Sequence, residues 1–295
     1  MKNLLGYYYN VYPEYIYKND TGYYFYINKI KYFFVLVNNK NIDSLVELSN
    51  NLYNKKIMVH TFIMAKNNTY VVPFDNNNYC LLRINCDDDC KVKLKDIVNF
   101  NNILLGNNNV RNYSSLWSNE VDDIEEEIID FNKEHKIITD YINYYIGLAE
   151  NAIEYYKDNV NESTFVSSIG HIKITYNMTY FDFYNPLNFV IDHRVRDLSE
   201  YVKSIFFNTL DSVRIINIVN SLNISKEEAC VFYCRMLYPN YYFNIYNDVL
   251  DGKIDEEKVN EILKLSLEYE ILLNDIQNIF HKKYGIPLIK WLKKN

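Results

Sequence analysis

The sequence predicts an α+β fold with a strand-rich first part and a helix-rich second part. In the first part, aromatic and β-branched runs alternate with turns of Asn, Asp, Gly and Lys. In the second part, apolar residues recur at helical spacing. The chain has 295 residues, more than a single hydrophobic core usually serves. We therefore expect two lobes, a β-rich one over residues 1–86 and a helical one over residues 87–295.

The first lobe is predicted to contain three strands, one helix and then two or three further strands. The helix is expected to start from an N-cap at Asp43, because leucines follow at helical spacing. The predicted strands cover residues 7–17, 23–27, 32–37, 61–65, 69–73 and 79–84.

The second lobe opens with a connector and a short helix over residues 87–105, and residues 115–158 are predicted to be mostly helical. Acidic residues at 122–127 point around the helix, so a solvated face is a better reading than a cation site. Residues 167–190 are expected to be irregular and β-like. Capping boxes are predicted at Asp197 with Glu200 and at Ser225 with Glu228. A last helix, residues 255–284, should end at Gly285.

Composition excludes several classes of protein. The net charge is −7 and the lysines are scattered, so we expect no nucleic-acid partner. The longest apolar run, residues 32–37, is too short to span a membrane. The 30 tyrosines could form stacking platforms for bases or sugars, but a codon bias spread along the whole chain is the favoured explanation.

The cysteines form two pairs at helical spacing, Cys86 with Cys90 and Cys230 with Cys234. Four thiols could make a zinc site, although C-x-x-C knuckles are more usual. Free, reduced thiols in a cytoplasmic protein are the preferred interpretation, because an odd total of five leaves one cysteine unpaired.

Residues 192–200, Asp-His-Arg-Val-Arg-Asp-Leu-Ser-Glu, resemble the signature D-x-x-x-R-D-[LI]-[AS]-E of spore-coat proteins. These proteins form the CotS/YutH branch of the aminoglycoside and choline phosphotransferase superfamily. Asn185-Pro186, seven residues before Asp192-His193, resembles the pattern of the YutH-type subgroup. Residues 116–125 and 286–292 are also similar. The resemblance implies a two-lobed protein-kinase-like fold.

A kinase of this superfamily must hold ATP phosphates and magnesium and accept a proton from the attacking hydroxyl. The resemblance places Val37 where a phosphate-pairing lysine belongs. In the catalytic loop, His171 stands at the histidine position. Lys173 stands in place of the aspartate that acts as the catalytic base, and Met178 stands in place of the asparagine that binds the metal. The first lobe has only two glycines and no G-x-G to cover phosphates.

The metal-binding aspartate of the superfamily corresponds to Asn185. An amide keeps the shape of a carboxylate but lacks its charge, and magnesium is usually bound through one or two carboxylates. Asp182, three residues earlier, is the alternative metal ligand if the alignment shifts.

Four polar residues of the signature remain: Asp192, His193, Arg196 and Asp197. The preferred interpretation is structural, with Asp192 and Arg196 as a buried ion pair. The resemblance gives Asp197 the role of supporting the catalytic loop. The functional alternative makes Arg196 or His193 an anion ligand in the cleft between the lobes.

We therefore expect a catalytically degenerate kinase-fold protein, a pseudokinase that needs no cofactor and binds protein partners, spore-coat components among them. It would be cytoplasmic, or lie in the spore coat if the organism sporulates. The alternative is an active small-molecule phosphotransferase with relocated acids that uses ATP and Mg²⁺. A third reading is a pocket that binds an anionic ligand through Lys173, His171 and Arg196.

Overall fold

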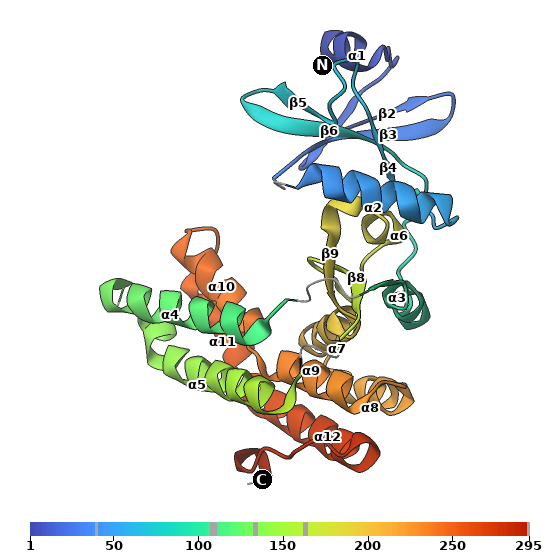
Figure 1. The fold of residues 1–295 in the computed structure, drawn as a ribbon. Coiled ribbons are helices and arrows are strands. Elements are labelled where there is room, and N and C mark those ends of the chain that lie inside the picture. The colour runs from blue at the N-terminus through green and yellow to red at the C-terminus, as the bar shows by residue number, and fades with distance from the viewer. Residues whose placement is uncertain (39–40, 107–110, 132–134, 162–164, 294–295) are drawn as a thin grey trace. The chain divides into compact units, whose positions relative to one another are not determined.

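The computed structural model describes residues 1–38, 41–106, 111–131, 135–161 and 165–293, which form two compact units (Figure 1). Unit 1 contains Met1–Lys93, His171–Lys173 and Asn177–Val190. Unit 2 contains Leu94–Gly170, Ile174–Tyr176 and Ile191–Asn295. The predicted lobe boundary between residues 86 and 87 stays a prediction.

Unit 1 is built on a six-stranded antiparallel sheet with the order β1-β2-β3-β6-β4, in which β5 pairs with β6. Three consecutive residues are buried in each of the central strands β3 and β6, as expected where both faces of the sheet are covered. The predicted strands at 23–27, 32–37 and 79–84 are confirmed to within a few residues. The six strands are β1 (Tyr17–Asn19), β2 (Gly22–Ile27), β3 (Ile30–Leu36), β4 (Thr61–Ile63), β5 (Val71–Phe74) and β6 (Asn77–Arg83).

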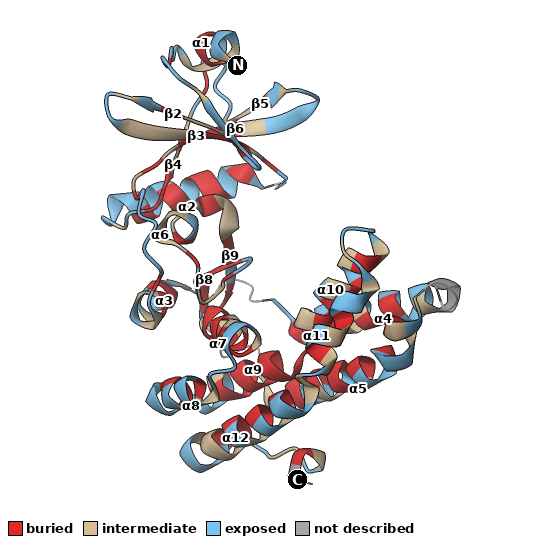
Figure 2. Ribbon diagram, turned by 180° about the vertical axis from the view of Figure 1, so that it is seen from behind, coloured by how far each residue is buried: buried red, intermediate tan, exposed pale blue. Residues whose placement is uncertain are grey.

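Helices α1 (Lys2–Tyr9) and α2 (Ile42–Asn54) cover opposite faces of this sheet (Figures 1 and 2). The core on the α1 side is entirely apolar, which makes burial its main source of stability. Its buried residues are Leu5, Phe25, Phe34, Ala65, Val72 and Leu81.

Two predictions in unit 1 are wrong. Residues 7–17 do not form a strand: α1 continues to Tyr9 and ends at Asn10, which has φ 56°. Packing of this segment on the sheet overrides the β propensity of its tyrosines, because Leu5 belongs to the core. The N-cap of α2 is Asn41, and Asp43 lies in the first turn, where its charge suits the helix dipole.

Unit 2 is helical and is organised around α9 (Lys226–Leu237), in which residues 229–237 are all buried (Figure 2). Helix α9 contacts α5, α7 and α12, which explains why residues 229–237 are buried on every side of the helix. None of the helices in the described part of the chain is both long and apolar enough to span a membrane. The other helices are α3 (Leu94–Asn101), α4 (Tyr113–Phe131), α5 (Lys136–Asn159), α7 (Arg196–Thr209), α8 (Ser212–Ser221), α10 (Asn240–Leu250), α11 (Val259–Leu263) and α12 (Ser266–Tyr284), with short turns η3 (Glu256–Lys258) and η4 (Trp291–Lys293).

A second, three-stranded sheet has the order β7-β8-β9. Strands β8 and β9 each include residues of both units, so the chain passes between the units within a strand. Between them lie a short helix and a 3₁₀ turn, which matches the irregular stretch predicted for residues 167–190. The elements are β7 (Leu104–Gly106), β8 (Ser167–His171), α6 (Tyr180–Phe183), η2 (Pro186–Asn188) and β9 (Phe189–His193).

The helix signals of the second part had mixed success. The capping box of Ser225 and Glu228 is confirmed in full, and Gly285 ends α12 with φ 70°. Asp197 is not an N-cap, because α7 begins at Arg196 and Val195 occupies the cap position. The long helix predicted over 255–284 is divided into η3, α11 and α12, since the chain turns near Leu265.

Candidate functional site

Of the two glycines of the first part, Gly22 is required by close backbone packing, whereas Gly6 faces only the exposed, movable ring of Tyr12. A Cβ on Gly22 would lie 2.3 Å from the Phe34 carbonyl oxygen, and one on Gly6 would lie 2.6 Å from the Tyr12 ring. In the β1–β2 turn, the Asn19 side-chain oxygen accepts the N–H groups of Thr21 at 3.3 Å and Gly22 at 2.8 Å. The donors of this turn are therefore paired within the chain.

Val37 lies just after β3 and is buried, with its N–H donating to the Asn78 carbonyl at 2.8 Å. It lines a depression of about 660 Å³. The rest of that depression is polar or aliphatic and comes from the start of α2, the turn before β5 and the start of β6. Its other lining residues are Asn38, Ile42, Asp43, Asn68, Thr69, Tyr70, Val71 and Asn78.

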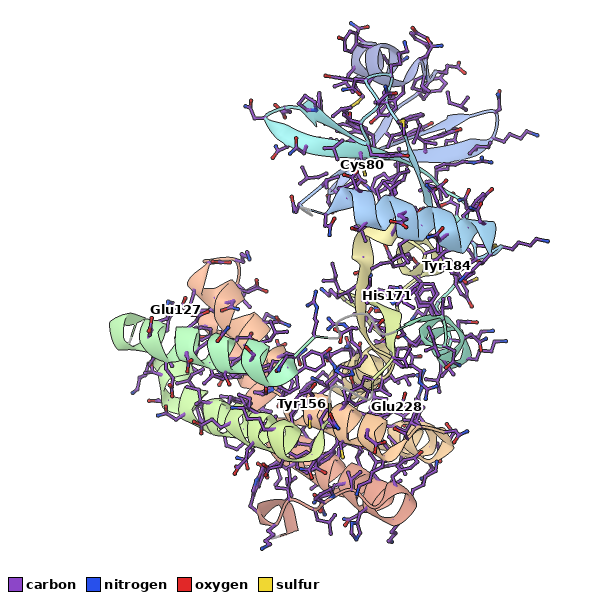
Figure 3. The ribbon with its side chains drawn as sticks, viewed as in Figure 1. Cys80, Glu127, Tyr156, His171, Tyr184 and Glu228 are labelled. Atoms are coloured by element: carbon purple, nitrogen blue, oxygen red, sulfur yellow. The ribbon has the colours of Figure 1, made fainter. Side chains whose placement is uncertain are left out.

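His171 is 1% exposed and belongs to the core of unit 1 (Figure 3). Its ring stacks on Phe183 with centroids 4.5 Å apart and meets Phe189 edge-on at 5.5 Å. Its Nε2 donates to the Phe183 carbonyl at 2.9 Å. The histidine position of the loop thus has a packing role in this chain.

Lys173 is exposed, and its backbone is held by Asn188 from both sides. The Lys173 N–H donates to the Asn188 side-chain oxygen at 3.1 Å, and the Asn188 amide donates to the Lys173 carbonyl at 2.9 Å. Sequence reasoning missed Asn188. Its position directly before the apolar strand β9 was the available signal.

Asn185 and Asp182 both make local hydrogen bonds through their side chains. The Asn185 side-chain oxygen accepts the Leu187 N–H at 3.1 Å and caps η2. The exposed Asp182 accepts the Thr179 hydroxyl at 3.0 Å, while Thr179 caps α6. One oxygen of each side chain is therefore used to shape this segment.

Residues 178–184, called the docked segment below, are bonded along the connector that follows β6. Val92 donates to the carbonyl of Met178 at 2.9 Å, Tyr180 donates to the carbonyl of Cys90 at 3.1 Å, and Phe181 donates to that of Asp88 at 3.2 Å. Met178, at the position of the loop asparagine, is itself buried. The docked segment is thus a fixed part of unit 1.

His60 holds the other side of the docked segment, a role that sequence reasoning missed. Its Nε2 donates to the Phe181 carbonyl at 2.9 Å, and its backbone N–H donates to the Tyr184 carbonyl at 3.0 Å. Its Nδ1 accepts the Asn85 N–H at 3.3 Å, which fixes the neutral tautomer. Burial lowers the pKa of His60 to about 4.

In unit 2, Asp192 is fully buried and has charged and neutral donors around it. It accepts the Tyr113 hydroxyl at 2.5 Å and pairs with Arg196 at 2.9 Å. The guanidinium of Arg111 lies 3.9 Å away. Because its lone pairs are used in this way, Asp192 is a structural anchor for the start of α7.

Asp197 is also buried and supports the strand that leads to His171. The Asn101 amide bridges, donating to Asp197 at 3.1 Å and to the Ile169 carbonyl at 3.0 Å. Asp197 lies so close to Gly170 that a Cβ there would be 3.0 Å from its carboxylate oxygen. The predicted supporting role of Asp197 therefore has a geometric basis.

His193 lies in the core of unit 2, 1% exposed. Its ring meets Phe165 edge-on at 4.4 Å, and its Nε2 lies 3.3 Å from the Tyr156 hydroxyl. Burial lowers the pKa of His193 to about 4, although the nearby Asp192 carboxylate opposes this. This histidine is held neutral at physiological pH.

A buried charge network joins α7 to α9 and the start of α10, and sequence reasoning missed it. Arg235 pairs with Glu200 at 2.6 Å and donates to the Ser199 hydroxyl at 3.1 Å. Lys203 lies 3.4 Å from Glu200 and donates to Asn240 at 2.6 Å. Burial alone would raise the pKa of Glu200, but Lys203 and Arg235 outweigh it and lower that pKa to about 2.

The predicted site residues fall into two sets. Val37, His171, Lys173, Met178, Asp182 and Asn185 lie in unit 1, whereas Asp192, His193, Arg196 and Asp197 lie in unit 2. All five cysteines are free thiols. Within the described ranges, no three His, Cys, Asp or Glu side chains are grouped so as to hold a metal ion.

Solved structures similar to this chain are small-molecule kinases. An aminoglycoside phosphotransferase from Alicyclobacillus acidocaldarius superposes with a TM-score of 0.65 at 8% identity, covering 92% of this chain and 93% of the other. Spectinomycin phosphotransferase, solved with ADP and spectinomycin, gives 0.59 at 12% identity, with 96% and 97% covered. At these identities the likeness is one of fold, and it confirms the predicted kinase-like fold.

The sequence itself is similar to a spore protein. Endospore coat-associated protein YutH of Bacillus subtilis (strain 168) is 25% identical over 209 residues, which are 62% of this chain and 61% of that protein. The match thus spans less than two thirds of the relative's length. Residues 2–276 match the sequence profile described as "Spore coat putative kinase YutH". The match confirms the resemblance, and the chain belongs to the YutH spore-coat family.

Proposed function

We propose that this protein is a catalytically degenerate member of its family, a pseudokinase that acts in the spore coat by binding other proteins. The single observation that carries the proposal is the use made of Asn185. This neutral side chain stands at the position of the metal-binding aspartate, and its oxygen accepts a hydrogen bond from the Leu187 N–H. A magnesium ion needs anionic oxygens there.

The position of the catalytic base supports the same conclusion. Lys173 carries an exposed ammonium, which cannot accept a proton and repels a nearby cation. General-base assistance is worth about 10²–10⁴-fold, so its loss alone would leave a poor enzyme. The β1–β2 turn adds to the argument, because Asn19 already takes the N–H groups of Thr21 and Gly22.

These positions are a poor fit for Mg·ATP, the cofactor that the kinase fold implies. The docked segment is bonded to the connector and to His60 through its backbone, so a carboxylate at its edge would have to come from Asp182. The proposed function therefore involves no chemical step on a bound nucleotide. A binding or structural role in the coat uses the fold without its chemistry.

Titration of the full chain with Mg·ATP tests the proposal. We expect no rise in Tm beyond that caused by MgCl₂ alone and no consumption of ATP, because ligands that bind the folded state raise its Tm. A nucleotide-dependent rise accompanied by turnover would overturn the proposal. The coat location is checked by following the tagged protein through fractionation of spores from a sporulating host.

A second candidate is an active small-molecule phosphotransferase that uses Asp182. It is favoured by one observation: Asp182 is an exposed carboxylate whose Oδ2 accepts the Thr179 hydroxyl. If turnover is detected, Asp182→Ala should abolish it, whereas the matched exposed variant Asp89→Ala should not. Equal activity of both variants would remove this candidate.

A further inference from the structure

An open cavity of about 330 Å³ lies on unit 2, and none of its lining residues belongs to the candidate site. It is formed by one side of α5 and the C-terminal turn η4, and its lining contains aromatic rings, amides and a glycine but no charged side chain. The lining residues are Asn143, Tyr144, Gly147, Leu148, Asn151 and Trp291.

The floor of this cavity exists because α5 has a glycine in its interior. A Cβ on Gly147 would meet no heavy atom within 4 Å, so packing does not require a glycine there. A glycine in a helix interior costs about 1 kcal/mol relative to alanine. The open space above Gly147 is therefore kept at some expense to the stability of α5.

The walls are held in place by hydrogen bonds. The Trp291 indole N–H donates to the Asn151 side-chain oxygen at 3.1 Å, and the Asn151 amide donates to the Gly147 carbonyl at 2.6 Å. The Tyr144 hydroxyl donates to Glu270 on α12. Both aromatic side chains are thus fixed through their polar ends, as in a preformed site.

We propose that this cavity binds one pyranose ring of a neutral saccharide. The C–H face of a pyranose is apolar and suits aromatic walls, whereas its hydroxyls suit amide groups that both donate and accept. Asn143 is exposed beside Tyr144 and supplies such an amide. An aliphatic side chain of a partner protein has no polar group that could pair with this amide. The absence of charge in the lining argues against phosphorylated or acidic sugars, and the volume suits a single small ring.

The test uses the full chain with soluble oligosaccharides of glucose and of N-acetylglucosamine as probes, and follows binding by calorimetry and tryptophan fluorescence. Trp291 should report binding, because the other tryptophan, Trp117, is buried against Tyr238. We expect saturable binding of at least one probe, and a loss of more than about tenfold in affinity in Gly147→Leu.

Gly147→Leu fills the floor while replacing a poor helix former with a good one, so loss of binding would not reflect unfolding. Glu154→Leu, on the same helix and outside the cavity, is the matched control and should bind as the wild type does. Trp291→Ala removes one aromatic wall of the cavity and should reduce the affinity for the saccharide independently of Gly147. Absence of saturable binding, equal affinity of the Gly147→Leu variant, or preferential binding of an apolar probe such as p-cresol would overturn the proposal.

Discussion

Asn185 and Asp192 are seven residues apart, yet the two segments around them are stabilised in different ways. In unit 1, residues 171–173 and 177–188 are held mainly by neutral hydrogen bonds, many of them to the backbone. In unit 2, the segment from Asp192 to Lys203 is held by buried charges that are paired with one another. Carboxylates are thus absent at Lys173 and Asn185, the positions that the family resemblance gives to the base and the metal ligand, whereas paired charges hold α7 to its neighbours.

Under the proposed function, this contrast accounts for a loss of catalysis that leaves the fold intact. A neutral side chain such as Asn185 can cap a turn as well as an aspartate does. A buried ion pair cannot lose one partner so easily, because the remaining charge has no solvent to stabilise it. Three predictions test the contrast, beginning with the largest effect.

Replacement of Arg235 by Met should destabilise the protein by about 3–5 kcal/mol, because it leaves Glu200, whose side chain is only 18% exposed, with one cation fewer. The change is measured as the free energy of unfolding in urea. Lys253→Met is the control, since Lys253 is 61% exposed in a surface ion pair and should change stability by less than about 0.5 kcal/mol. A loss below about 1 kcal/mol for Arg235→Met would show that the charge network does not join α7 to α9 as described.

Acid should weaken both units through one buried histidine each. His60 and His193 have pKa values lowered to about 4 by burial, so between about pH 6.5 and pH 4 the unfolded chain binds more protons than the folded chain. Stability is therefore full above about pH 6.5 and falls as the pH drops through this window, by on the order of 3 kcal/mol for each histidine. Urea unfolding at several pH values measures the slope.

The variant His60→Gln separates the two contributions. Its amide can still donate to the Phe181 carbonyl but does not titrate, so the acid-dependent loss should fall by roughly half. The same slope in wild type and variant would mean that His60 is not the buried neutral group described for unit 1.

The smallest effect is expected at Asn185. Asn185→Ala removes the cap of η2 and should cost about 1 kcal/mol, whereas Asn185→Asp keeps the cap and should stay within about 0.5 kcal/mol of the wild type. Both are measured by thermal unfolding. If the alanine and aspartate variants are equally stable, capping is not what Asn185 does.

Local signals predicted much of the fold. The Ser225–Glu228 capping box and the stop at Gly285 depend on residues a few positions apart, so the sequence contains the whole interaction. Asp197 carried the same local signal, but its side chain bonds Asn101, 96 residues away, and the helix starts one residue earlier. The tyrosines of α1 have a high β propensity, so the sequence predicts a strand. Their packing partners in the sheet, such as Phe34 against Tyr9, favour a helix instead and are not visible in the sequence.

The candidate site was predictable only in part, for the same reason. A motif shows which residue stands at a position, and it assigns Asn185, Lys173 and Asp192 to positions of the family pattern. It does not show that His60 bonds Phe181 across 121 residues, or that Glu200 bonds Arg235 across 35. The fold brings such partners together, and no local pattern in the sequence links residues that are this far apart in the chain.

The distribution of thiols provides a practical probe of the docked segment. Four of the five cysteines are buried, and Cys90 alone is exposed. Because the Tyr180 N–H donates to the Cys90 carbonyl, a dye attached to that sulfur would report release of the segment without any added mutation. A hydrogen bond to Asp88 raises the pKa of the Cys90 thiol, so labelling with a maleimide should proceed faster in mildly alkaline buffer.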